Sequence, residues 1–147
     1  MPATAFAATF AALYAAHQVG DHWIQTHHQA VTKGSPGSSG RVACTRHVAT
    51  LTSTKGIALG LVVLVTGLSL NPLAIIAGLA VDALSHYWAD RQTTLTRLAR
   101  RVGKAEFAAL GDGFTAPAGT GAYALDQSWH IGWLFAAALL ASIGATS

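Results

Sequence analysis

The chain has very little cysteine and very little charge. Of its 147 residues only Cys44 is a cysteine, which excludes an intramolecular disulfide framework. Charged residues make up 10% of the sequence, hydrophobic residues make up 52%, and the mean hydropathy is +0.42. This composition excludes an ordinary soluble domain, in which about a quarter of the residues are charged. It predicts one integral membrane domain over residues 1–147.

Basic residues are missing from long parts of the chain. The nine Lys and Arg residues fall between Lys33 and Lys55 or between Arg91 and Lys104. Because none precedes Lys33, the N-terminus lacks the charged region that begins a secretory signal, and we expect the first apolar segment to be retained. Clusters of this kind are typical of membrane-flanking loops, so the net charge of +3 does not indicate a nucleic-acid partner.

Four apolar stretches have the length and composition of membrane helices. The short turn Ser69-Leu70-Asn71-Pro72, with Pro72 at a favourable helix start, joins the second stretch to the third and predicts a tight antiparallel hairpin. The predicted fold class is all-α, a polytopic membrane bundle of four transmembrane helices. The predicted spans are residues 4–23, 48–70, 73–88 and 123–143.

The segments between the predicted spans differ in character. Residues 33–46 begin with a Gly/Ser-rich run and are predicted to form a flexible cytoplasmic loop. Residues 92–110 alternate apolar and basic positions, which predicts an amphipathic helix lying at the lipid headgroups. Loops rich in Lys and Arg face the cytoplasm, so we expect the N-terminus and the C-terminus outside.

Most of the six acidic residues lie one helical turn from a histidine. Residues four apart share one face of a helix and are ~6 Å apart along its axis, so each pair can present an imidazole nitrogen and a carboxylate to one ion. The predicted topology brings these pairs, with His47, to the cytoplasmic end of the bundle. The predicted metal ligands are His17, Asp21, His86, Asp90, Asp126 and His130.

Mixed imidazole and carboxylate ligands suit zinc, manganese or iron, and we expect one or two divalent ions, with zinc or manganese preferred. Two ions would activate water and clamp a phosphoryl or ester oxygen, whereas one ion would leave a carboxylate as general base. The sequence leaves both arrangements open. The predicted catalytic residues are Asp21, Asp90 and His47.

Other polar residues near the pairs have predicted supporting roles. Asp82 lies one turn before His86 and is expected to orient its ring from outside the ligand set. Gln25 and Gln127 could hold the site water or a substrate oxygen. His22, His27 and His28 are expected to lie in solvent. The candidate phosphate-binding residues at the mouth are Lys55 and Arg91.

The ordered set of motifs resembles a family of small bacterial membrane proteins of unknown function. It comprises His17-x-x-x-Asp21-x-x-x-Gln25, followed by Lys33, a lone His47, His86-x-x-x-Asp90 and Asp126-Gln127-x-x-His130, across residues 13–133. The resemblance implies a bacterial inner (plasma) membrane location. More remotely, the chain is similar to membrane-bound metal-dependent hydrolases, which implies hydrolysis of a lipid-linked or phosphate ester. The Gly/Ser-rich loop and the basic segment depart from the family pattern.

The leading hypothesis is an integral membrane protein with a His/Asp metal site at the cytoplasmic interface, acting as a metal-dependent hydrolase. Its expected partners are the lipid bilayer and an anionic lipid or lipid-linked substrate, while its oligomeric state is left open. One alternative is a noncatalytic membrane scaffold with a structural metal or polar cluster. Another is an ion- or proton-conducting module, because intramembrane His and Asp also serve as relays.

Overall fold

The computed structural model describes residues 3–113 and 118–146, which are mainly helical. Within these residues there is no strand, and an isolated antiparallel bridge pairs Ser69 with Thr146. The predicted all-α class is confirmed. In chain order the helices are α1 (Ala3–Val19), the π-helical turn η1 (Gly20–Ile24), α2 (His27–Thr32), α3 (Gly37–Thr66), α4 (Pro72–Asp90), α5 (Thr93–Arg101), α6 (Ala105–Ala108) and α7 (Gly121–Ala141).

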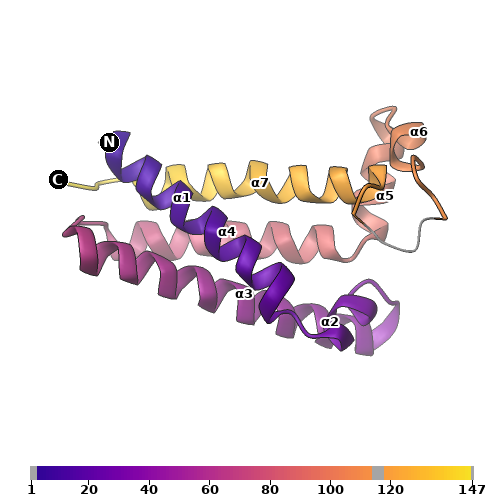
Figure 1. Cartoon of the computed structure of the whole chain (residues 1–147), viewed down its shortest axis with the longest axis horizontal. Helices are drawn as coiled ribbons and strands as arrows, with labels where there is room; N and C mark the ends of the chain where they lie inside the picture. Colours follow the sequence, from indigo (N-terminus) through magenta and orange to yellow (C-terminus); the bar gives the residue numbers. More distant parts are fainter. Residues whose placement is uncertain (1–2, 114–117, 147) are drawn as a thin grey trace.

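Four long helices, α1, α3, α4 and α7, run lengthwise through the molecule (Figure 1). Both chain ends and the α3–α4 turn lie at one end, which we call the terminal end (Figure 1). The short helices α2, α5 and α6 lie at the opposite end, which we call the basic end because segments 33–46 and 91–104 lie there. The bundle therefore has two chemically different ends.

Local signals set the tight connection between α3 and α4. α3 ends at Gly67, whose φ of 68° lies in the left-handed region that glycine adopts without strain. Asn71 caps α4, and its side chain accepts hydrogen bonds from the backbone N–H groups of Leu73 and Ala74. Pro72 occupies the first turn, where no backbone donor is needed. These residues form the hairpin that the sequence predicted.

Toward the terminal end, the core is apolar. At Gly78, α4 comes so close to α7 that a Cβ atom would lie 2.6 Å from the carbonyl oxygen of Ala137. Only glycine permits this approach, as in many close helix pairs. The buried residues of this core, contributed by α1, α3 and α7, are Ala12, Leu13, Leu59, Leu134, Ala137 and Ala138.

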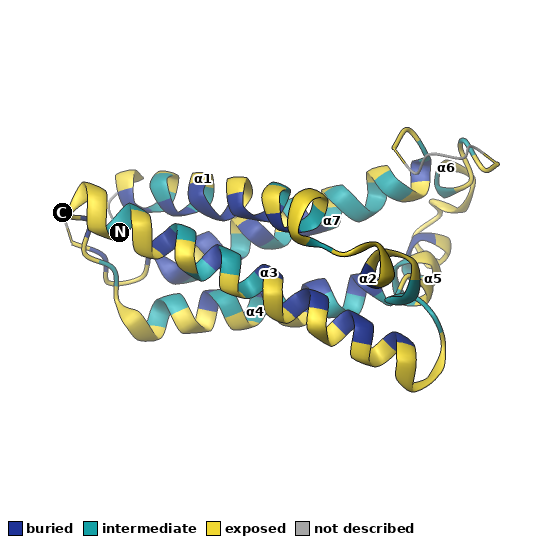
Figure 2. Ribbon diagram, turned by 60° about the horizontal axis from the view of Figure 1, so that its bottom comes forward, coloured by how far each residue is buried: buried dark blue, intermediate teal, exposed yellow. Residues whose placement is uncertain are grey.

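Of the helices that the structure describes, α3 and α4 are long and apolar enough to cross a membrane. Only 17% of the most apolar stretch of α3 and 22% of that of α4 is buried inside the protein. Their apolar side chains therefore face outward, and Figure 2 shows exposed residues along both helices. The core helix of a soluble protein would bury such residues, so this outward apolar surface is typical of contact with lipid.

Two predicted segment boundaries need correction. The predicted flexible loop of residues 33–46 is shorter, because Pro36 occupies the N-cap of α3 and the helix begins at Gly37. The predicted single helix of residues 92–110 is divided into α5 and α6. Gly103, with φ 74°, reverses the chain between them, since a left-handed residue cannot continue a helix.

Candidate metal centre

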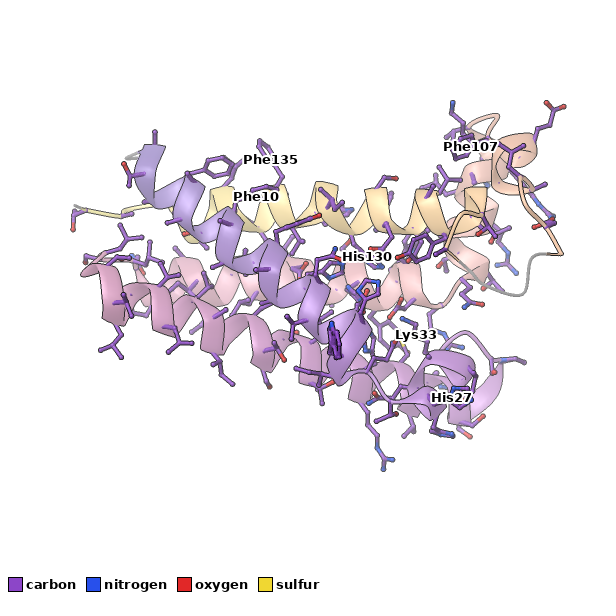
Figure 3. The ribbon with its side chains drawn as sticks, viewed as in Figure 1. Phe10, His27, Lys33, Phe107, His130 and Phe135 are labelled. Carbon is purple, nitrogen blue, oxygen red and sulfur yellow. The ribbon has the colours of Figure 1, made fainter. Side chains whose placement is uncertain are left out.

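The His/Asp pairs meet inside the bundle, at the level where α1 and α4 end. His17 lies in the last turn of α1, and Asp90 is the last residue of α4. His47 and His130 lie well inside α3 and α7, because these two helices extend farther toward the basic end. Figure 3 shows His130 within the bundle and Lys33 beside α2. Each of these four His and Asp side chains is at most 2% exposed, so the site belongs to the protein interior.

The π-helical turn η1 positions Asp21 against α3. Gly20 begins this turn and is buried against Leu51, and a Cβ on Gly20 would lie 2.2 Å from the Leu51 Cδ1 atom. The missing side chain lets the end of α1 approach α3 closely. Asp21 thereby reaches His47 on α3 while its other oxygen lies 3.6 Å from His17 Nε2. Such π turns are frequently found at functional sites.

Four side chains converge from η1, α3 and α4. His47 Nε2 lies 2.9 Å from Asp21 Oδ1, 3.1 Å from His86 Nε2 and 3.3 Å from Asp90 Oδ2. His86 Nε2 in turn lies 3.2 Å from Asp90 Oδ2 and 3.7 Å from Asp21 Oδ1. We call Asp21, His47, His86 and Asp90 the primary cluster.

Five of the six separations between the ligand atoms of the primary cluster are similar to those around one tetrahedral metal ion. Ligand atoms held 2.0–2.1 Å from a tetrahedral zinc ion are roughly 3.3–3.4 Å apart. The five measured separations fall on both sides of that value, between 2.9 and 3.7 Å. Within the described residues, Asp21 Oδ1 and Asp90 Oδ2 are buried without a hydrogen-bond partner. The donor set and its unsatisfied oxygens could therefore hold a metal ion.

A second group comprises His86, Asp90 and His130, and it too could hold an ion. His130 Nε2 lies 3.8 Å from Asp90 Oδ1 and 3.5 Å from Asp126 Oδ1, and the rings of His86 and His130 stack at 3.9 Å. Lys33 Nζ, however, contacts the same Asp90 oxygen at 2.9 Å. Because an ammonium competes with a metal for that oxygen, the geometry favours the primary cluster.

Lys33 brings a positive charge into the site from the short linker after α2. Burial alone would lower the pKa of Lys33, but the carboxylates of Asp90 and Asp21 outweigh burial and hold this pKa above its usual value. In formal charges, Asp21, Asp90 and Asp126 contribute −3 and Lys33 contributes +1, which leaves −2 on the site. A divalent cation would neutralise this charge in a region that disfavours net charge.

Gln25 orients His47 from outside the primary cluster. With its amide oxygen turned toward these donors, Gln25 accepts hydrogen bonds from His47 Nδ1 at 3.1 Å and Lys33 Nζ at 2.9 Å. A histidine that donates through Nδ1 has Nε2 free to bind a metal. Gln127 donates to Asp126 Oδ2 at 3.3 Å, on the other side of the site.

Asp82 does not orient His86 as the sequence predicted. Its carboxylate pairs with Lys55 Nζ at 2.6 Å, and both side chains are buried. A buried carboxylate gains more from an opposite charge than from a neutral imidazole, and Lys55 on α3 reaches it. The predicted phosphate-binding role of Lys55 is therefore wrong, since its fully buried ammonium is already paired. Within the described residues, His86 Nδ1 has no hydrogen-bond partner.

The other predicted residues lie around this site. Arg91 donates from Nη1 to the carbonyl of Lys33 at 2.5 Å and from Nη2 to the carbonyl of Ser35 at 2.6 Å. These two hydrogen bonds hold the linker that carries Lys33, and they occupy the Arg91 guanidinium with backbone carbonyls. His17 lies beside the primary cluster through Asp21 but belongs to neither ligand group. As expected, the remaining histidines, His22, His27 and His28, are exposed.

Lys33 is the site residue to which sequence analysis assigned no role. It comes from a linker, where no helical spacing relates it to Asp90, although it follows the His17–Gln25 motif within the same stretch of chain. No family model, curated protein or solved structure matches this chain. The functional interpretation therefore rests on the geometry of its own residues.

Proposed function

We propose that this protein is an integral membrane hydrolase with a divalent metal ion bound by Asp21, His47, His86 and Asp90. Its substrate would be a phosphate ester or another ester attached to a lipid. The observation that carries the proposal is the convergence of two imidazole nitrogens and two unsatisfied carboxylate oxygens in a buried site.

The membrane part of the proposal is supported by the surface of the bundle. Few residues in the most apolar stretches of α3 and α4 are buried inside the protein, and α1 and α7 pack beside these helices along the same long axis. We infer that all four helices span the bilayer. Lys and Arg gather at the basic end, which would face the cytoplasm, while both chain ends would lie outside. A bacterial inner membrane location belongs to the same proposal.

The mechanism assigns each polar group a separate task. When bound, the ion would acidify a water molecule and polarise the ester oxygen. Asp126 Oδ1 lies 3.5 Å from His130 Nε2, and the neutral His130 imidazole could take a proton from water and return it to the leaving oxygen. Lys33 would balance negative charge beside Asp90. Gln25 would keep His47 Nε2 directed at the ion.

The test is hydrolysis of hexadecyl 4-nitrophenyl phosphate by detergent-purified protein, with and without added zinc or manganese. We expect the wild-type protein to hydrolyse this substrate only when the metal is present. His86→Ala should be inactive, since His86 belongs to both ligand groups. His22→Ala removes an exposed histidine outside the cluster and should retain the rate. Metal-loaded protein with no turnover would contradict catalysis and favour the noncatalytic scaffold.

A proton-conducting module is the second candidate, and the Lys55–Asp82 pair favours it. This pair is buried one helical turn from His86, so it extends the chain of titratable groups deeper into the bundle. Protein reconstituted in liposomes would then carry a proton flux that Asp82→Asn reduces. A hydrolase without conduction would show no difference in flux between protein-containing and empty liposomes.

A further inference from the structure

An apolar groove runs between α5 and α7, beside the candidate metal centre. It has a volume of about 570 Å³, within the usual range for small-molecule sites. α5 contributes the apolar side of an otherwise basic helix, and α7 contributes two tryptophans separated by a glycine position. The residues that define the groove are Leu95, Leu98, Val102, Trp129, Gly132 and Trp133.

A second cavity of about 330 Å³ joins this groove to the charged residues of the site. It is lined by Lys33, Asp90 and Asp126, and so reaches the second ligand group. The groove and the cavity have Leu95, Ala99 and Leu125 in common, so an apolar surface adjoins a charged one. A ligand that fills both must itself have an apolar part and a charged part.

We propose that this surface binds an amphiphile with a long alkyl tail and a phosphate head. The tail lies in the groove between α5 and α7, and the head lies in the charged cavity beside Lys33. The inference rests on the proposed function in one respect: Asp90 and Asp126 also line that cavity and repel a phosphate unless a metal ion neutralises them. Head binding therefore depends on the metal, whereas tail binding does not.

The walls of the groove favour an alkyl chain. Trp129 donates its indole N–H to Ser85 Oγ at 2.9 Å and stacks on Trp88 at 4.9 Å, so it presents ring carbon rather than a free donor. Gly132 leaves open space, since a Cβ there would meet no atom within 4 Å. Basic residues on α5, including Arg97 and Arg101, suit a helix at the anionic headgroup surface, from which a lipid tail can enter.

The test combines a substitution that fills the groove with crosslinking that shows where a probe binds. The probe is hexadecyl phosphate with a photoreactive diazirine at the end of the alkyl chain, crosslinked to detergent-purified protein and located by mass spectrometry. In Gly132→Leu the added side chain occupies the open space, and crosslinking to α5 and α7 should fall at least about tenfold. Gly60→Leu makes the same change at an exposed position of α3 where a Cβ also meets nothing within 4 Å, and should not reduce it.

A second variant guards against misfolding of Gly132→Leu. Val102→Trp fills the groove from the α5 side at a residue that is 62% exposed, and should reduce crosslinking equally. Zinc removal should lower crosslinking of the phosphate probe but not of a matching hexadecanol probe. Each sample is also assayed for bound zinc.

The outcomes separate the groove from the metal site. Protein that binds zinc but is labelled evenly over its lipid-facing helices, or is labelled equally well in Gly132→Leu, overturns the amphiphile site and leaves the proposed function standing. Groove labelling by both probes in protein that binds no zinc supports the tail site and overturns the proposed metal chemistry. Equal zinc dependence of the two probes contradicts the assignment of the phosphate head to the charged cavity.

Discussion

The two ends of the bundle are built from opposite kinds of side chain. Toward the terminal end, alanine, leucine and phenylalanine predominate, with Thr9 and Ser142 as buried polar residues, and Phe10 and Phe135 meet edge to face at 6.3 Å (Figure 3). Toward the basic end, the same helices bury imidazoles and carboxylates. The apolar packing at the terminal end stabilises the fold. The buried polar groups toward the basic end cost free energy of folding. This contrast fits the metal-binding role that we propose for the primary cluster.

The largest expected effect lies at the Lys55–Asp82 pair, which separates the two kinds of core. Asp82→Leu leaves the Lys55 ammonium buried without its counter-charge and should lower the free energy of unfolding by about 3–5 kcal/mol. The double variant Lys55→Met with Asp82→Leu should recover most of this loss. Chemical denaturation in detergent measures both. If Asp82→Leu is as stable as the wild type, the Lys55–Asp82 ion pair does not contribute to the stability of the bundle.

A smaller effect is expected at the ligands themselves. His86→Ala removes the nitrogen that both ligand groups contain, so zinc affinity should fall at least about 100-fold, or about 2.8 kcal/mol. Isothermal titration with zinc gives this value, and His22→Ala is the matched control. Comparable zinc binding in the two variants would mean that the ion, if bound, does not contact the primary cluster.

In the apolar core, we expect substitutions to change the stability of the fold and not the zinc affinity. Gly78→Ala places a Cβ 2.6 Å from the Ala137 carbonyl oxygen and should destabilise the fold by about 1–3 kcal/mol while leaving zinc affinity unchanged. At Gly60, where nothing lies within 4 Å, the same substitution should instead stabilise α3 by about 0.5–1 kcal/mol. Thermal unfolding with and without zinc tests the pair. A loss of zinc affinity in Gly78→Ala would show that the two regions are coupled.

The smallest expected effect concerns the residue behind the ligands. Gln25→Ala removes the acceptor that holds His47 Nδ1, so zinc affinity should fall about tenfold without a large change in stability. Gln127→Ala is the control, because Gln127 contacts Asp126 outside the primary cluster. Equal zinc titration curves for the two glutamine variants would contradict the role of Gln25 in orienting His47.

Local spacing predicted much of this molecule, and long-range contacts account for the rest. The His-x-x-x-Asp pattern predicted which residues share a helix face, and the Asn71-Pro72 signal predicted a helix start. The Lys55–Asp82 pair and the Lys33–Asp90 contact join separate helices or a linker, so no periodicity could reveal them. The sequence also could not show that η1 is a π turn, because that depends on Gly20 fitting against Leu51.

The depth of the site was predicted only in part. Charge patterning placed the pairs at the cytoplasmic ends of the helices, which agrees with His17 and Asp90 at the ends of α1 and α4. His47 and His130 instead lie within their helices, because α3 and α7 begin farther out than the apolar stretches that predicted them. Helix ends can extend beyond a hydrophobic segment wherever capping and propensity allow, so hydropathy alone could not set them.

The most direct measurement of the central claim is a crystal structure of zinc-loaded protein with anomalous scattering at the zinc absorption edge. The account predicts a peak about 2.0–2.2 Å from Asp21 Oδ1, His47 Nε2, His86 Nε2 and Asp90 Oδ2, inside the bundle. A peak at the exposed His27 and His28, or none at any histidine, would contradict it.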